Sequence, residues 1–316
     1  MESERQFLAG RMAVLSVPGG LFLAVFLAGL AYLFMFSFWH FEAEKRMAVP
    51  GFEFDNYARF LTDPFFYTFL WRTLRVSLFT TLICLVMGYP VAWVLARSRS
   101  LLKKRLLLMA VVVTALIGVV NRSYSWLILL GVDGPLNYFL TRLGLDAASV
   151  HNLLAPLTGL EPMDAPQAWG LLFNEFAVVV GLIHRLLPFM IIFLSIALEN
   201  VDPTLEAMSR SLGGGPMRTF RKITLPLSLP GALAGSLFVF GLSASDFVMP
   251  SLLGGLKVKT MSNLIYENAL LVMNFPFGSA MAFIMIGSIV LIFAGVGGFA
   301  LAMRRRRNIA RRLAHA

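Results

Sequence analysis

The stretch Glu199–Gly231 reads ENVDPTLEAMSRSLGGGPMRTFRKITLPLSLPG. Asp202 followed by Pro203 predicts the start of a helix, because an aspartate caps free backbone N–H groups and proline is tolerated in the first turn. The glycines that begin at Gly213 predict the end of this helix, since glycine accepts the left-handed backbone of a helix terminus. Pro216 permits a second helix to start. We therefore expect a helix, a sharp turn and a second helix, which together form a knob suited to a groove on a partner.

Long apolar segments flank this stretch and recur along the chain. Hydrophobic residues make up 58% of the 316 residues and charged residues 14%, against about 45–50% and about 25% in a soluble domain. About 20 apolar residues suffice for a helix to cross the hydrocarbon core of a bilayer. We expect an all-α, polytopic membrane protein with one transmembrane domain over residues 1–316. Its six expected spans are approximately 13–38, 71–96, 106–130, 171–198, 231–253 and 278–303, and the loop 199–230 joins the fourth to the fifth.

Positive charge is concentrated in alternate connecting segments, within a formal net charge of +10. Basic short loops stay in the cytoplasm, so both termini are expected there. This topology accounts for the basic balance, and we expect membrane lipid as a partner but no nucleic acid. The single cysteine, Cys84, offers neither a disulfide nor a cysteine metal site, and no cofactor is expected. The basic residues concerned are Arg97, Arg99, Lys103, Lys104, Arg105, Arg210, Arg218, Arg221, Lys222, Arg304–Arg307, Arg311 and Arg312.

The spacing within the loop resembles the signature of the permease subunits of binding-protein-dependent ABC importers, in particular their polyamine branch. That signature is Glu-Ala-Ala, three residues, Gly, nine residues and Ile-x-Leu-Pro, and here nine residues separate Gly213 from Ile223-Thr224-Leu225-Pro226. The Glu-Ala-Ala positions are Ala207, Met208 and Ser209 here, so Ala207 takes the place of the usual glutamate. Glu206 lies one residue earlier, and whether it substitutes stays open. Further short matches are Gly88-Tyr89-Pro90-Val91-Ala92, Asn121–Trp126, Leu187-Pro188-Phe189-Met190 and Ser245–Pro250.

This resemblance implies a type I ABC importer permease (MetI-like) fold in a bacterial inner membrane. It also implies that the loop is a coupling helix docked in a cleft of an ATPase subunit. The chain has no Gly-x-x-x-x-Gly-Lys-Ser/Thr phosphate loop, so a separate ATPase subunit would hydrolyse ATP and this chain is not an enzyme. The implied partners are a second related permease in a heterodimer, two ATPases and a periplasmic binding protein that delivers spermidine, putrescine or a related cationic or opine-like solute. The expected ATPase-coupling residues are Glu206, Ala207, Gly213, Pro216 and Pro226.

Charged residues inside spans are costly and are therefore candidate solute contacts. Asp246 and Glu175 could attract an amine, and the aromatic faces of Tyr124, Trp126 and Phe247 could hold a cation. Alternatively, Arg122 pairs with Asp246 or Glu175 and the set only holds helices together. A rise of about 1.5 Å per residue places Arg122 and Asp246 in the outer part of the bundle, with Glu175 near the outer surface.

Two neighbouring residues of the fourth span are expected to be structural. We expect His184 to make a hydrogen bond between helices and Arg185 to extend towards the cytoplasm.

Two other functions remain as alternatives. A secondary transporter or channel would work without ATP, and it would require coupling-ion residues at mid-membrane and paired broken helices. An intramembrane enzyme would require a catalytic cluster, but the four histidines are scattered among different segments. Neither alternative explains the spacing from Gly213 to Pro226.

Overall fold

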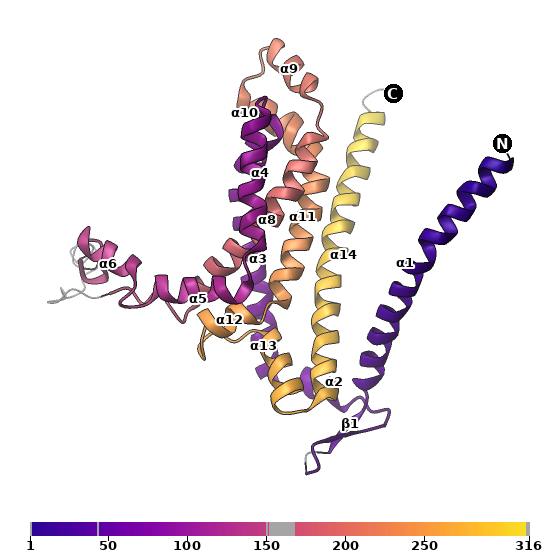
Figure 1. Ribbon diagram of the computed structural model, residues 1–316, viewed down its shortest axis with the longest axis vertical. Coiled ribbons are helices and arrows are strands. Elements are labelled where there is room, and N and C mark those ends of the chain that lie inside the picture. The colour runs from indigo at the N-terminus through magenta and orange to yellow at the C-terminus, as the bar shows by residue number, and fades with distance from the viewer. Residues whose placement is uncertain (1, 43, 150, 152–167, 314–316) are drawn as a thin grey trace. The chain divides into compact units, whose positions relative to one another are not determined.

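The computed structural model describes residues 2–42, 44–149, 151 and 168–313 (Figure 1). The chain forms two compact units. One comprises Met1–Tyr67 with Leu264–Ala316, and the other comprises Thr68–Asn263. The expectation of one transmembrane domain over residues 1–316 is not tested by this division and stays a prediction.

The first unit joins the two ends of the chain. Phe34 packs edge-on against Phe283, with ring centroids 5.0 Å apart, and Phe66 packs against Phe277 at 5.1 Å. A small antiparallel hairpin, in which His40 lies opposite Val49, was not expected of an all-α chain. The elements of this unit are α1 (Glu2–Phe36), β1 (His40–Glu42), β2 (Met47–Val49), α2 (Asp55–Thr62), η2 (Glu267–Leu271, a π-helical turn) and α14 (Phe275–Leu313).

The second unit is built around the packing of α8 on α11. Gly235 permits their close approach, since a Cβ at this position would lie 2.8 Å from Cβ of Phe193. The buried side chains of Leu186, Met190 and Leu194 form the centre of the core. The main elements are α3 (Pro64–Arg97), α4 (Leu101–Leu116), α5 (Val119–Leu130), α6 (Pro135–Arg142), α8 (Glu175–Glu199), α9 (Pro203–Ser211), α10 (Pro216–Thr219), η1 (Phe220–Thr224, a π-helical turn), α11 (Leu225–Ser245), α12 (Val248–Leu253) and α13 (Met261–Tyr266).

Five helical segments in the described residues are long and apolar enough to cross a membrane, or six if one bent pair is a single span. The bent pair is Leu101–Leu116 with Val119–Arg142, and its angle is 91°. Figure 1 shows α5 running across the direction of α4. The third expected span, 106–130, is therefore not one straight helix. The depth expected for Arg122 assumed a straight helix, which the structure does not show.

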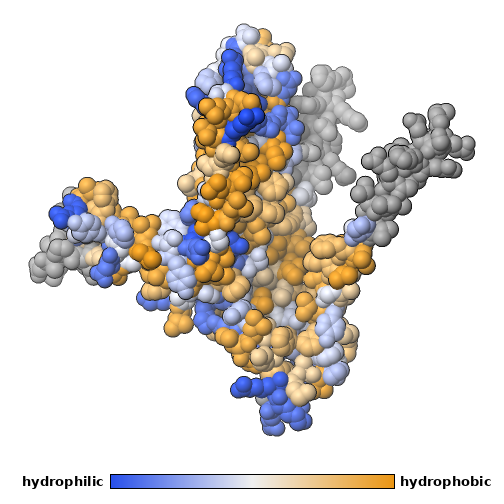
Figure 2. Space-filling view, viewed as in Figure 1, coloured by the Kyte–Doolittle hydropathy of each residue, from blue (hydrophilic) through white to orange (hydrophobic). Residues whose placement is uncertain are grey.

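The surface agrees with a membrane location. Figure 2 shows hydrophobic residues along the side of the second unit that carries α4, whereas many hydrophilic residues gather around α9. In the first unit, large apolar side chains of α1 are exposed, including Leu21 at 66% and Phe22 at 75%. Such a surface is suited to lipid or to a partner helix rather than to water.

Candidate functional site

The loop between α8 and α11 has the local structure that its residues predict. Oδ1 of Asp202 accepts a hydrogen bond of 2.8 Å from the N–H of Thr204, which caps α9. The same hydrogen bond lowers the pKa of the Asp202 carboxyl, because it stabilises the charged form. Gly213 has a φ of +78°, and Pro216 is the first residue of α10. The predicted helix, glycine turn and second helix are confirmed.

Glu206 fixes α9 from the inside. Its residue exposure is 3%, and Oε1 accepts hydrogen bonds from Nη2 of Arg97 at 2.8 Å and from Oγ1 of Thr224 at 3.0 Å. Nη2 of Arg97 also donates to the carbonyl of Val201 at 3.0 Å. A buried carboxylate with these partners is strongly held in place. Glu206 therefore ties α9 to the end of α3 and to the start of α11.

A second set of hydrogen bonds closes the turn. Oγ of Ser209 lies 2.9 Å from Oγ1 of Thr219, and the N–H of Gly214 donates to the carbonyl of Ser209 at 2.8 Å. A Cβ at Gly214 would lie 2.6 Å from that carbonyl oxygen. The knob, defined as residues 202–219, is thus held together internally as well as at its base.

The predicted coupling residues differ in how accessible they are. Four of the five are exposed, and these are Ala207, Gly213, Pro216 and Pro226. The fifth, Glu206, points inward, so its side chain is an anchor in this structure rather than a contact surface. The sequence interpretation missed large apolar side chains that stand out from the knob. They are Leu205, Met208, Leu212 and Met217, with exposures between 40% and 85%. The sequence does contain a signal for them, because each is an apolar residue in a short and otherwise polar segment.

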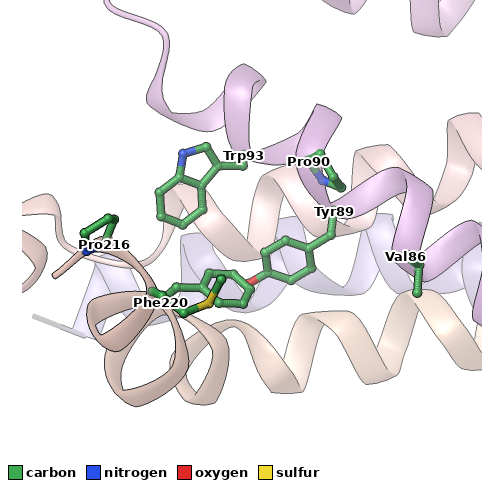
Figure 3. A pocket seen from close by; sticks show the side chains of 7 residues that line it. Val86, Tyr89, Pro90, Trp93, Pro216 and Phe220 are labelled. Carbon is green, nitrogen blue, oxygen red and sulfur yellow. The ribbon is translucent and has the colours of Figure 1, made fainter.

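An open groove runs between α3 and the segment α10–η1 (Figure 3). Its volume is about 510 Å³. The ring of Phe220 lies 5.3 Å from the ring of Tyr89 and 6.0 Å from that of Trp93. The hydroxyl of Tyr89 lies 2.7 Å from Oγ of Ser228, which links α3 to α11. The lining residues are Val86, Tyr89, Pro90, Trp93, Pro216, Met217 and Phe220.

Asp246 is paired with Arg185, which was not expected. The side chain of Asp246 is fully buried, and Oδ2 accepts a hydrogen bond from Nη1 of Arg185. Oδ1 accepts from the N–H groups of Val248 at 2.9 Å and Met249 at 3.1 Å, which caps α12. The expectation that Arg185 extends towards the cytoplasm was therefore wrong. Charged side chains inside membrane spans usually pair with one another, and Asp246 is the partner that Arg185 reaches.

Glu175, the first residue of α8, is paired with two arginines of α3. Nη2 of Arg75 donates to its carboxylate, and Nε of Arg72 lies 3.5 Å from Oε1. Its position also suits the positive end of the α8 dipole. The carboxylate side chain is 37% exposed, unlike that of Asp246. Both carboxylates thus form ion pairs, but neither pairs with Arg122.

Arg122 occupies the bend between α4 and α5. Its Nη2 donates to the carbonyl of Thr114 and, at 3.2 Å, to the carbonyl of Ile117. The alternative in which Arg122 pairs with Asp246 or Glu175 was wrong. The reason is the bend, because it frees carbonyls at the end of α4 that must find donors inside a membrane protein.

The three predicted pathway aromatics lie in different environments. Tyr124 and Phe247 are exposed, at 53% and 37%. Trp126 is half-buried, and its Nε1–H donates to Nδ1 of His184 at 2.9 Å. This bond confirms that His184 makes a hydrogen bond between helices. The structure brings Trp126 to α8, whereas Tyr124 and Phe247 are more exposed.

Known proteins resemble this chain over most of its length. The chain is 33% identical over 285 residues to the spermidine/putrescine transport system permease protein PotB of Salmonella typhimurium (strain SL1344), covering 89% of this chain and 91% of that protein. It is 31% identical over 272 residues to the inner membrane ABC transporter permease protein YdcU of Escherichia coli (strain K12), covering 86% and 84%.

Solved structures support the fold. A bacterial ABC transporter involved in the import of the acidic polysaccharide alginate matches with a TM-score of 0.63 at 19% identity, covering 96% of both chains. The MetNI methionine ABC transporter in an inward-facing conformation matches with a TM-score of 0.52 at 16% identity, covering 75% of this chain and 94% of that one. The expected MetI-like permease fold is confirmed.

The family model of the binding-protein-dependent transport system inner membrane component matches residues 65–308. This range contains the knob and its anchor Glu206. The chain therefore belongs to the family of inner-membrane permeases of binding-protein-dependent ABC importers.

Proposed function

We propose that this permease imports a polyamine such as spermidine or putrescine, or a related cationic or opine-like solute. The relatives named for spermidine and putrescine support this, since they align over about nine-tenths of the chain. In this proposal a periplasmic binding protein delivers the solute. The chain works in a heterodimer with a second related permease.

The single observation that carries the mechanism is the anchored knob. Two ATPase subunits, which hydrolyse the ATP, would each hold one knob, and their closure would move the knobs of the two permeases together. A knob fixed through Glu206 to both α3 and α11 transmits such a displacement to the spans, whereas a loose loop would absorb it. The exposed side chains of Met208 and Leu212, with Ala207, Gly213 and Pro216 around them, would make the contact.

The proposed topology places the knob and both termini in the cytoplasm. The exposed cations around α9, α10 and the start of α4 support this orientation, because basic short loops are retained on the cytoplasmic side.

We further propose that Glu175, Tyr124, Trp126 and Phe247 contact the solute. Glu175 is partly exposed, and its two arginine partners would compete with an amine for it. Tyr124 and Phe247 are partly exposed, and aromatic rings attract cations. Asp246 is fully buried and paired, so in this proposal it positions Arg185 and α12 on the pathway instead of touching the solute.

The test is the ATPase activity of the assembled complex in lipid nanodiscs. The complex of both permeases and the ATPases is assayed with the binding protein alone and with the binding protein plus spermidine or putrescine. We expect stimulation by the loaded binding protein, and we expect it to vanish when Met208 and Leu212 are both replaced by serine. Met47→Ser with Val49→Ser, on the exposed hairpin, is the matched control.

The outcomes separate the parts of the proposal. Failure of the ATPases to assemble with the wild-type permease would contradict the importer mechanism and favour an ATP-independent transporter. The bend between α4 and α5 gives that rival one of the broken helices that it requires. Assembly without a response to polyamines would contradict only the choice of solute.

A further inference from the structure

Three cations lie in the chain segment that forms one wall of the groove between α3 and α10–η1. Arg218, Arg221 and Lys222 are all exposed, and no acidic side chain among the described residues lies within ion-pair distance of them. They fall within five residues of chain, directly after the groove residue Met217 and on either side of the groove residue Phe220. One segment thus supplies both apolar wall and positive charge.

The groove walls lie on a membrane span. Val86, Tyr89, Pro90 and Trp93 belong to α3, which is long and apolar enough to cross a bilayer. Val86 is 71% exposed and precedes Arg97, at the end of α3, by eleven residues, which is about 16 Å along a helix. A partner in the aqueous phase would not reach that depth, so the inner part of the groove is open to hydrocarbon.

The basic segment at one end of the groove and the apolar walls at the other match the headgroup and the acyl chain of a lipid. We propose that the groove binds an anionic phospholipid of the surrounding bilayer, with its phosphate at Arg218, Arg221 and Lys222 and one acyl chain along Val86, Pro90 and Phe220. Basic residues next to membrane helices recognise anionic headgroups, and Tyr89 and Trp93 are residue types favoured at the membrane interface. The cationic rim would repel a polyamine, so this groove is distinct from the solute pathway.

The π-helical turn η1 contributes to the shape of the site. Phe220 is its first residue, and the turn runs to Thr224, which is hydrogen bonded to Glu206. Wide turns of this kind are frequent at functional sites. A lipid held at Arg221 and Lys222 would therefore contact the segment that joins the knob to α11.

Lipid retention by the purified permease complex tests the proposal. The complex is exchanged into mixed micelles containing equal phosphatidylglycerol and phosphatidylcholine, and bound lipid is measured by native mass spectrometry. We expect preferential retention of phosphatidylglycerol. We expect this preference to fall by about fivefold for each cation removed in the series Arg218→Gln, Arg221→Gln and Lys222→Gln.

A matched control removes the same charge elsewhere. Arg99, Lys103 and Arg105 are also exposed and, within the described residues, have no acidic partner. Replacing these three by glutamine should leave the preference unchanged. If the preference for phosphatidylglycerol falls equally when either set of three cations is replaced by glutamine, the proposal is overturned in favour of a diffuse effect of net charge. Val86→Trp, which fills the groove, should reduce retention of both lipids.

A photocrosslinking residue at Val86 identifies the occupant directly. Crosslinks to phospholipid are the expected result. Crosslinks to the second permease or to an ATPase would overturn the proposal, because the groove would then be a protein interface. The readout needs no transport, so failure here would leave the proposed importer function intact, and failure of the polyamine assay would leave the lipid site intact.

Discussion

Helix α3 carries an arginine–carboxylate pair near each end, and the two pairs differ in burial. At one end, Arg97 and Glu206 have side-chain exposures of 17% and 4%. At the other, Arg75 and Glu175 have exposures of 41% and 37%. An exposed pair is screened by water and contributes little to stability, whereas breaking a buried pair leaves an unpaired charge in an apolar environment.

The partners of the two carboxylates extend this contrast. Glu206 also accepts a hydrogen bond from Thr224, so three elements meet at one carboxylate. Glu175 has a second arginine, Arg72, with Nε 3.5 Å from Oε1 and on the same helix as the first. The first arrangement fixes a geometry, while the second neutralises charge at the start of α8 and leaves room for exchange. We infer that the contacts at the knob end of α3 are rigid, whereas the ion pairs of Glu175 can exchange partners.

The largest loss of stability is expected from Glu206→Ala. Removing this carboxylate leaves Arg97 without its acidic partner in a mostly buried site, which costs about 3–5 kcal/mol of the free energy that docks α9. We expect faster hydrogen exchange in the amides of α9 and a lower thermal unfolding midpoint in nanodiscs.

Arg210→Gln is the control for Glu206→Ala. Nη2 of Arg210 lies 3.8 Å from Oε2 of Glu206, but its side chain is 64% exposed. We expect a change in stability below about 1 kcal/mol. Similar losses in the two variants would contradict the claim that burial makes the Glu206 anchor strong.

A smaller loss of stability is expected from Gly213→Ala. The left-handed backbone at Gly213 costs a residue with a Cβ roughly 1–2 kcal/mol. Gly215 is the matched control, because its φ of −63° suits any residue and a Cβ there would meet no atom within 4 Å. The thermal midpoint should fall for Gly213→Ala and stay constant or rise for Gly215→Ala. A fall of the same size in both would show that the glycine turn is not strained.

Glu175→Gln should have an effect of at most about 1 kcal/mol on stability, because the carboxylate is partly exposed. The wild-type contribution should also shrink at high salt, since screening acts on exposed pairs. Thermal midpoints of the wild type and the variant, measured at low and at high ionic strength, should therefore converge. A salt-independent difference between them would contradict the exchange of partners inferred at this end of α3.

The smallest effect is expected at Asp202, and it depends on pH. The hydrogen bond from Thr204 lowers the pKa of this carboxyl in the folded state. Its contribution is therefore present above the unfolded-state pKa and is lost as the pH falls through the lower folded-state value. Hydrogen exchange in the first turn of α9, measured down to about pH 3, should reveal the loss. Asp202→Asn keeps a capping oxygen and should remove the pH dependence.

Much of the fold can be predicted from the sequence, because the deciding features are local. Long apolar runs identify the spans, and Asp202, Pro203 and Gly213 set the limits of α9 through capping and backbone conformation. The bend between α4 and α5 could not be predicted, since the apolar run continues through it and Gly118 alone is a weak signal. The hairpin His40–Val49 is too short to leave a clear pattern.

The site is less predictable, because it depends on which helices lie side by side. The sequence identifies Asp246, Glu175 and Arg122 as costly charges in or near the spans. Their partners come from other helices, and no spacing within the chain specifies that Arg185 reaches Asp246. The inward direction of Glu206 likewise follows from the packing of α9 on α3 and α11. One-dimensional patterns thus predict which groups require partners but not which partners they obtain.

The number of solute molecules moved per ATP hydrolysed tests the central claim most directly. It is measured in proteoliposomes containing the assembled complex, for the wild type, Glu206→Ala and Glu175→Ala. We expect Glu206→Ala to retain ATP hydrolysis but to reduce this ratio by about tenfold, corresponding to 1.4 kcal/mol of lost coupling, because an undocked knob does not transmit its displacement. We expect Glu175→Ala to change solute affinity with little effect on the ratio. An unchanged ratio in Glu206→Ala would contradict the role of the buried anchor in coupling.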